Sequence, residues 1–118
     1  MLFLFNTNII PSEAVVRVSK ITAKNAAELA ANGFTSAIGH EATAQAFSEI
    51  IGQDVPVNRI QAQPQGGDVA ISLKLNGRLP EGQILNRTQL NEIGYTLYLI
   101  QFFGLHEAEI VPTGYAAI

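Results

Sequence analysis

Apolar residues follow strand-like spacing in some stretches of the chain and helical spacing in others, which predicts a succession of strands and helices. Leu2–Asn6 reads as a short buried strand, and a β-branched run predicts a second strand near Ala14–Ile21. The pattern then changes to helix formers, with Thr22 suited to an N-cap and Asn32-Gly33 to a C-terminal stop. The first third of the chain is therefore expected to fold as two strands and a helix.

The middle of the chain predicts a longer helix and then a hairpin. Apolar residues recur at helical spacing from about His40 to Ile51, and Gly52 is expected to end that helix. The stretch "VPVNRIQAQPQGGDVAISLKL", residues 55–75, predicts two strands joined at Gly66-Gly67-Asp68. From residue 69 onward apolar and other residues alternate, which is typical of a strand with one buried face.

The last predicted elements are a short helix and an apolar strand. Asn86 and Gln89 resemble a capping box before a helix that ends at Gly94, and "YTLYLIQFF" then predicts a strand. No repeat or linker interrupts the pattern. We therefore expect a single α/β domain over residues 1–103, with helices packed against a mixed β-sheet, and a C-terminal extension of that domain over residues 104–118.

Composition narrows the classes of function. The chain has 118 residues, is 47% hydrophobic and 14% charged, and carries a formal net charge of −3. This balance favours a compact fold, and no basic stripe is available to neutralise the phosphates of duplex DNA. With no cysteine, disulfides, a thiolate nucleophile and cysteine-based zinc sites are excluded.

Targeting and membrane signals are weak. The apolar start "MLFLF" is too short for a signal-peptide core, and no apolar run approaches the roughly 18–20 residues that span a bilayer. We expect a cytoplasmic protein, in the host cytoplasm if the gene is viral, with no membrane partner.

Few side chains could perform proton or metal chemistry. The chain has two histidines, His40 and His106, and lacks His-x-x-x-His spacing, a phosphate-binding Walker loop and a nucleophile elbow. A metal site built from both histidines and a glutamate is an alternative, but we expect no metal and no cofactor.

His40 is the first candidate for chemistry. It follows Gly39 at the start of a predicted helix, where unpaired backbone N–H groups and the helix dipole favour a phosphate. Gly39 leaves space for a ligand, and the histidine could give a proton to a leaving oxygen. A surface histidine without a task explains the same residue equally well.

Two arginines in predicted loops or strand ends are further candidates. Arg78 and Glu81 lie in "NGRLPEGQIL" after a predicted strand, and Arg59 lies in "VNR". A guanidinium matches phosphate oxygens, and a nearby glutamate could orient a hydroxyl or the histidine. Taken alone, a solvated turn explains Arg78 and Glu81 better, and Arg59 also reads as an ordinary surface arginine.

Taken together, three segments resemble a known family. The order "SAIGHEAT", "VPVNRI", "RLPEGQIL" is similar to the type III anti-CRISPR ring nucleases, small proteins of archaeal viruses, phages and bacteria, and to their cellular relatives. The resemblance covers roughly residues 1–103, and the pairing of Gly-His-x-x-Thr with Arg-Leu-x-Glu-Gly is more specific than either half.

The resemblance implies a homodimer that cleaves cyclic tetra-adenylate to linear di-adenylates without metal, countering or resetting type III CRISPR signalling. It implies catalytic roles for His40, Arg78 and Glu81. It also implies ligand contacts by a set of residues outside that group: Asn6, Gly39, Thr43, Arg59 and Lys74. Departures from the family pattern concern ligand contacts, since Ile9 and Ala42 stand where some members have serine and Lys74 where another has glutamine.

Such a reaction needs little from the protein. The ribose 2′-hydroxyl is an internal nucleophile, so the site must align it, stabilise charge and protonate the departing 5′-oxygen. His40 would be the general acid, Glu81 would assist it, and Arg78 with the helix N-terminus would stabilise charge. The alternatives are a dimeric module that binds a nucleotide or nucleic acid without cleaving it, and a purely structural protein.

Overall fold

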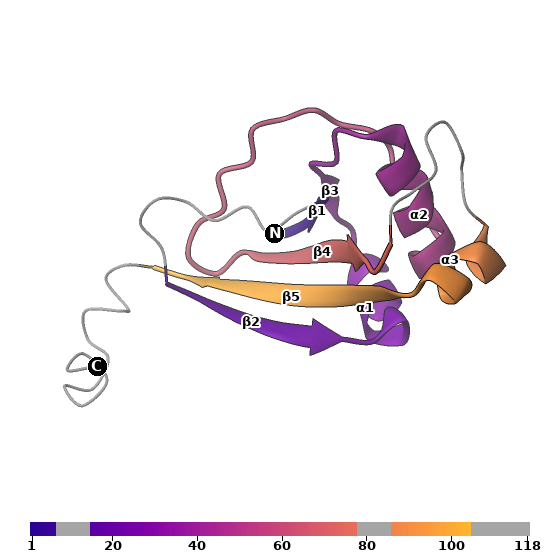
Figure 1. Cartoon of the computed structure of the whole chain (residues 1–118). Helices are drawn as coiled ribbons and strands as arrows, with labels where there is room; N and C mark the ends of the chain where they lie inside the picture. Colours follow the sequence, from indigo (N-terminus) through magenta and orange to yellow (C-terminus); the bar gives the residue numbers. More distant parts are fainter. Residues whose placement is uncertain (7–14, 78–85, 105–118) are drawn as a thin grey trace.

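A mixed β-sheet flanked by helices forms the protein (Figure 1). The computed structural model describes residues 1–6, 15–77 and 86–104. Within these residues the five strands are ordered β2-β5-β4-β1-β3. The element bounds, in chain order, are β1 Leu2–Phe5, β2 Val15–Ile21, α1 Ala23–Ala30, β3 Thr35–Ser36, α2 Glu41–Ile51, β4 Val69–Leu75, α3 Arg87–Ile93 and β5 Tyr95–Phe103. The expected α/β domain with a mixed sheet is confirmed.

Strand direction divides the sheet into two halves. β1 runs parallel to both β3 and β4, whereas β5 runs antiparallel to β4 and to β2. The carboxyl ends of β1, β3 and β4 therefore lie at one edge of the sheet. In open α/β sheets that edge is where ligands bind, because the chain segments leaving parallel strands converge there.

The helices begin and end where the sequence indicates. Thr22 caps α1 by accepting a hydrogen bond from the Asn25 N–H (3.1 Å), and Gly52 ends α2 with φ +73°. The capping box of Asn86 and Gln89 at the start of α3 is present in both directions. No helix in the described part of the chain is long and apolar enough to cross a membrane.

The main core lies between the helices and one face of the sheet. Its buried side chains come from α1, α2, α3 and three strands, and the largest of them include Leu4, Phe47, Ile71, Leu90 and Leu97. Alternation along β1, β4 and β5 places every second residue on this face. At about 1.5–3 kcal/mol for each large apolar side chain, this burial holds α2 against the sheet.

The opposite face of the sheet is also buried over part of its area. Phe3 and Phe5 pack there with ring centroids 5.8 Å apart, beside Ile100 and Phe102. The expectation that β4 has one buried face is wrong in this region, because Ala70 and Ser72 are buried as well as the alternate residues. The reason is that a segment following α2 crosses this face and packs Ala62 against the aromatic cluster.

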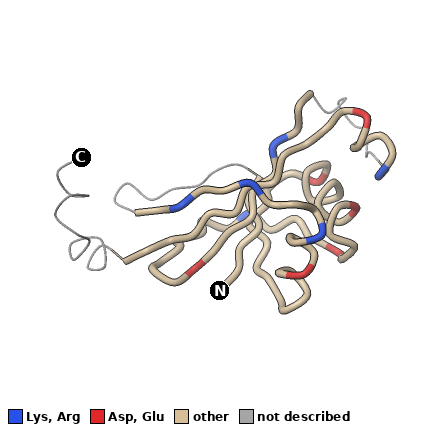
Figure 2. The backbone as a smooth tube through the Cα atoms, turned by 90° about the horizontal axis from the view of Figure 1, so that it is seen from below, with Lys and Arg blue, Asp and Glu red and all other residues tan. Residues whose placement is uncertain are grey.

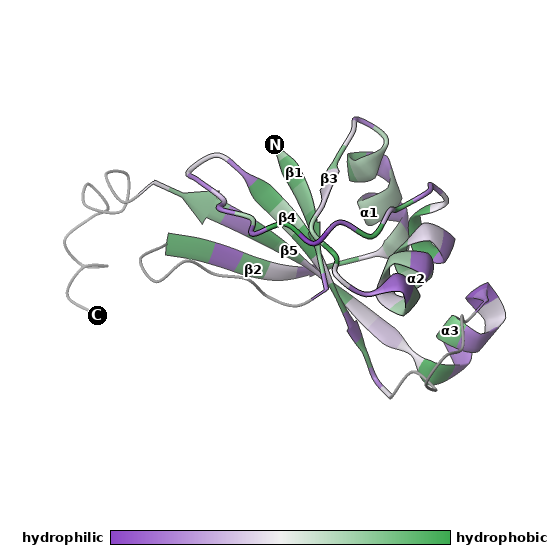
Figure 3. Ribbon diagram, turned by 90° about the horizontal axis from the view of Figure 1, so that it is seen from above, coloured by the Kyte–Doolittle hydropathy of each residue, from purple (hydrophilic) through white to green (hydrophobic). Residues whose placement is uncertain are grey.

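That crossing segment corrects a second prediction. Residues 55–64 form no strand, although a β-hairpin was expected over residues 55–75. β4 already has hydrogen-bonded neighbours on both sides, β1 and β5, so no position beside it is free. The segment, which we call the arm (residues 55–64), instead arches over the strands in both views of the ribbon (Figures 1 and 3). Its hydrophilic residues stand out against the hydrophobic strands in Figure 3.

Local bonding explains why the arm is irregular. The Ile60 N–H donates to the Asn58 carbonyl (3.0 Å), which makes a three-residue turn centred on Arg59 and breaks any strand there. The Gly66-Gly67-Asp68 turn exists, with Gly67 at φ +92°, but it leads from the arm into β4 and joins no hairpin. The two-residue strand β3 was not predicted, since two residues carry no periodic signal.

Candidate functional site

A pocket opens at the carboxyl end of β1. Its volume is about 500 Å³, and its lining combines the end of β1, the link from β3 to α2 and the arm: Asn6, Ala37, Gly39, Arg59, Ile60, Gln61 and Ala62. This is within the usual range for small-molecule sites, and the position matches the strand edge where α/β proteins bind ligands.

Hydrogen bonds fasten the arm to the β3–α2 link. The Asn58 N–H donates to the Ile38 carbonyl, and the Asn58 side-chain amide donates to the Ser36 carbonyl, both at 2.8 Å. In return the buried Ser36 hydroxyl donates to the Pro56 carbonyl at 2.7 Å. These bonds explain why an irregular segment can hold a fixed position beside the pocket.

Arg59 follows Asn58 in the arm and bonds to the β3–α2 link as well. Its Nε donates to the Gly39 carbonyl at 2.9 Å, and its side chain is exposed. Its two terminal nitrogens have no hydrogen-bond partner within the described residues. Because Nε fixes the guanidinium and the two terminal nitrogens are available as donors, the group can bind an anion.

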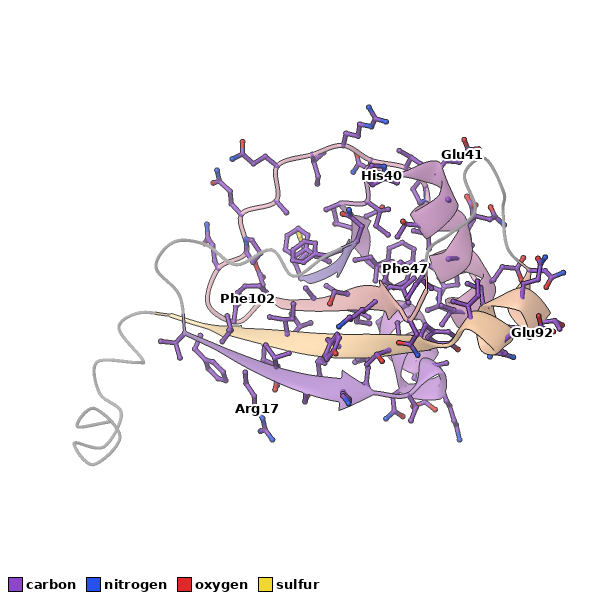
Figure 4. The ribbon with its side chains drawn as sticks, viewed as in Figure 1. Arg17, His40, Glu41, Phe47, Glu92 and Phe102 are labelled. Carbon is purple, nitrogen blue, oxygen red and sulfur yellow. The ribbon has the colours of Figure 1, made fainter. Side chains whose placement is uncertain are left out.

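His40 directly follows Gly39, the residue whose carbonyl accepts the hydrogen bond from Arg59. It is the N-cap residue of α2, with extended backbone and no side-chain cap hydrogen bond, and it is exposed. Figure 4 shows it at the start of α2, with Glu41 beside it, while Phe47 lies on the sheet side of the helix. The imidazole is therefore accessible to a bound molecule.

The start of α2 offers donors as well. The first backbone N–H groups of a helix have no intrahelical acceptor, and no other acceptor for those of residues 41–43 occurs in residues 1–6, 15–77 or 86–104. Together with the helix dipole they favour a negative group near His40. Glu41, in the first turn of α2, already places one negative charge near these donors.

The other predicted residues are placed less directly. Thr43 lies half-buried in the first turn of α2, and Lys74 is exposed on β4, paired with Thr96; neither lines the pocket. Arg78 and Glu81 lie outside the described residues, as does His106. The structure thus brings together Asn6, Gly39 and Arg59 in one pocket, with His40 next to it in the chain.

Four residues of the described pocket lining were not singled out from the sequence: Ala37, Ile60, Gln61 and Ala62. Ile60 and Gln61 line the pocket directly after Arg59. Spacing carried one signal, since residues 59 and 61 would share a face of the strand that was expected there. Only the arm's attachment to the β3–α2 link shows which residues of this stretch reach the pocket.

Charge in the described residues is segregated by element. Acidic residues occur on helices and connecting segments, whereas β1 to β5 contain only the basic Arg17, Lys20 and Lys74 as charged residues (Figure 2). Among the described residues, the pocket lining has Arg59 and no carboxylate. Within residues 1–6, 15–77 and 86–104 no group of three histidine, aspartate or glutamate side chains is placed to hold a metal ion.

A family model described as STIV B116-like matches residues 2–97 of the sequence. The chain belongs to the STIV B116-like family. The match spans every described strand except the end of β5, and it includes all pocket residues, His40 and the 78–85 segment.

Relatives of this STIV B116-like chain occur in archaeal viruses. The ORF117 protein of Acidianus two-tailed virus is 41% identical over 108 residues, covering 86% of this chain and 92% of its own. Protein 26 of Sulfolobus islandicus filamentous virus is 36% identical over 107 residues, covering 86% and 91%. The chain is thus similar over nearly its whole length to small viral proteins.

The fold is shared with a solved structure of the family. B116 of Sulfolobus turreted icosahedral virus superposes with a TM-score of 0.73 at 21% identity, covering 85% of this chain and 97% of that one. At this identity the likeness concerns the fold alone.

Proposed function

We propose that this protein is a metal-independent ring nuclease that cleaves cyclic tetra-adenylate to linear di-adenylates and so counters or resets type III CRISPR signalling. The observation that carries the proposal is the hydrogen bond from Arg59 Nε to the Gly39 carbonyl, 2.9 Å long. It places a cation with open donors beside the backbone that leads directly into His40, at the mouth of a pocket. An RNA phosphodiester needs this combination of anion contact and proton donor.

The 2′-hydroxyl of the substrate is the nucleophile in this mechanism. Its oxygen attacks the adjacent phosphorus, and the bond from phosphorus to the 5′-oxygen breaks, leaving a 2′,3′-cyclic phosphate. His40 protonates the departing 5′-oxygen, and the N–H groups at the start of α2 stabilise the added negative charge. The hydroxyl's proton passes to a water molecule, and Glu81 would assist this transfer or position His40.

Arg59 and Arg78 have separate tasks in the proposal. Arg59, fixed by its bond to Gly39, binds a phosphate and holds the ring. Arg78 and Glu81 follow the carboxyl end of β4 in the chain, and β4 is parallel to the β1 strand that leads to the pocket. Arg78 would contact the reacting phosphate, and Asn6, Thr43 and Lys74 would contact the rest of the ligand.

Incubating the purified protein with cyclic tetra-adenylate in EDTA tests the proposal. We expect linear di-adenylates that end in 2′,3′-cyclic phosphate or the derived 3′-phosphate, and much slower cleavage by His40→Ala, Arg78→Ala and Glu81→Ala. Retention of an intact ring would make the protein a binding module. No binding and no cleavage would leave a structural role.

A further inference from the structure

We propose that Gln61, with Ile60, forms an adenine-reading subsite in the pocket that opens beside Arg59. This inference rests on the proposed function, because it assigns the base that accompanies the phosphate held by Arg59. It makes Gln61 a specificity-determining residue that acts on base identity and takes no part in the chemistry.

The composition of the pocket suggests a base as well as a phosphate. Arg59 is the only charged residue in the described part of the lining, while the remaining described residues are small or apolar except for two carboxamides, Asn6 and Gln61. Ile60 is 42% exposed and lines the pocket, so it offers apolar surface to a ligand there. A flat heterocycle against Ile60 would remove that apolar surface from water.

Gln61 is available for binding. Its side chain is exposed and makes no hydrogen bond to another residue of the described ranges. It stands two positions after Arg59, so their Cα atoms are at most roughly 7 Å apart. The anchored arm thus presents a phosphate-binding group and a carboxamide to the same pocket, one after the other.

A carboxamide distinguishes adenine from hypoxanthine at one edge of the ring. Its NH₂ can donate to N7 while its oxygen accepts from the 6-amino group, a pairing typical of glutamine and asparagine with adenine. Hypoxanthine carries an oxygen at position 6, which would face the carboxamide oxygen and repel it. The subsite therefore favours adenine through one donor and one acceptor on a single side chain.

Equilibrium binding of two linear dinucleotides tests the subsite without requiring cleavage. The probes are di-adenylate and di-inosinate, and the proteins are wild type, Gln61→Leu and the matched control Gln63→Leu. Gln63 is an exposed residue of the same arm that does not line the pocket. We expect wild type to prefer di-adenylate by about tenfold, since a bidentate base contact contributes roughly 1–3 kcal/mol of discrimination.

Gln61→Leu should lower the preference for di-adenylate to about one, and Gln63→Leu should keep it. Equal binding of both probes by wild type, no binding of either, an unchanged preference in Gln61→Leu, or a lost preference in Gln63→Leu would each overturn the subsite. Ring cleavage by wild type is measured separately, so failure of the adenine subsite and failure of the nuclease function give different results.

Discussion

Arg59 Nε and the Gly39 carbonyl oxygen are joined by a 2.9 Å hydrogen bond that ties the arm to the start of α2. A Cβ at Gly39 would lie 3.4 Å from Arg59 Cγ, so the arginine side chain packs closely over this residue. The contact therefore links two segments that are 20 residues apart in sequence, one bearing a cation and the other leading to a histidine.

Arg59→Ala should weaken binding of cyclic tetra-adenylate by about tenfold or more, because a hydrogen bond to a charged group contributes roughly 1.5–3 kcal/mol. The loss of one phosphate contact should also reduce the steepness with which affinity falls as salt rises. Titrations at several salt concentrations measure both effects. Arg59→Lys keeps the positive charge but loses the planar guanidinium, so its affinity should lie between those of wild type and Arg59→Ala.

Arg17→Ala is the control for charge alone. Arg17 is exposed on β2, at the edge of the sheet away from β1 and β3, and points out beneath that strand (Figure 4). Arg17→Ala should leave the affinity for cyclic tetra-adenylate nearly unchanged. Equal losses in Arg59→Ala and Arg17→Ala would mean that general charge, and not the pocket, attracts the ligand.

His40→Ala should lower the single-turnover cleavage rate by roughly 100-fold or more, the usual scale for lost acid–base catalysis. Folding should be preserved, since His40 is exposed and its side chain makes no cap hydrogen bond. Ligand affinity should also change little. His106→Ala should cleave at close to the wild-type rate. A His40→Ala protein that did the same would remove His40 from the mechanism.

The sequence predicts those elements whose signals are local. Helix ends could be predicted because each signal lies within one turn of the helix boundary that it sets. The signals are Thr22, Gly52 and the pair Asn86–Gln89. The strand β5 was found because its nine residues are mostly aromatic and aliphatic, a composition typical of a strand. Such elements need no knowledge of the rest of the fold.

The arm was mispredicted because its conformation depends on distant partners. Its residues have strand-like composition, but the positions beside β4 are taken by β1 and β5, and Asn58 bonds instead to the β3–α2 link. Hence Asn6, Gly39 and Arg59 could be nominated from the sequence, while Gln61 and Ile60 became visible only once the arm was placed. Roles of Arg78 and Glu81 stay predictions of the resemblance.

Ser36→Ala should destabilise the protein by about 1–3 kcal/mol, because it leaves the buried Ile38 N–H without its partner and removes the bond to the Pro56 carbonyl. The Ser36 hydroxyl donates to the Pro56 carbonyl (2.7 Å) and accepts from the Ile38 N–H (3.3 Å). Urea denaturation measures the change. Ligand affinity should fall as well, since the arm loses one of its attachments.

Ser19→Ala makes the same chemical change on β2, where the side chain forms no hydrogen bond within the described residues. Ser19 is half-buried, and its replacement should alter stability by no more than about 0.5 kcal/mol, because no hydrogen bond is lost. If Ser36→Ala were equally harmless, the arm would be held by packing alone.

Cleavage should proceed at an unchanged rate in EDTA. The reason is the nucleophile: a substrate hydroxyl adjacent to the phosphate needs no metal-activated water. Comparing rates in EDTA, in Mg²⁺ and in Mn²⁺ checks this, and product termini should carry a 2′,3′-cyclic phosphate or a 3′-phosphate. Activity lost in EDTA and restored by a divalent ion would refute it.

The functional unit should be a two-fold dimer that encloses one ring. A single pocket of about 500 Å³ suits part of such a ligand, whereas two copies bring two pockets, two Arg59 side chains and two His40 side chains to it. Two-fold symmetry also fits a ring of four equal units, with one cut on each side. Light scattering should give twice the 12.7 kDa chain mass, and titration should give one ring per two chains. A monomer at working concentration, or one ring bound per chain, would contradict the arrangement and require each chain to perform both cuts alone.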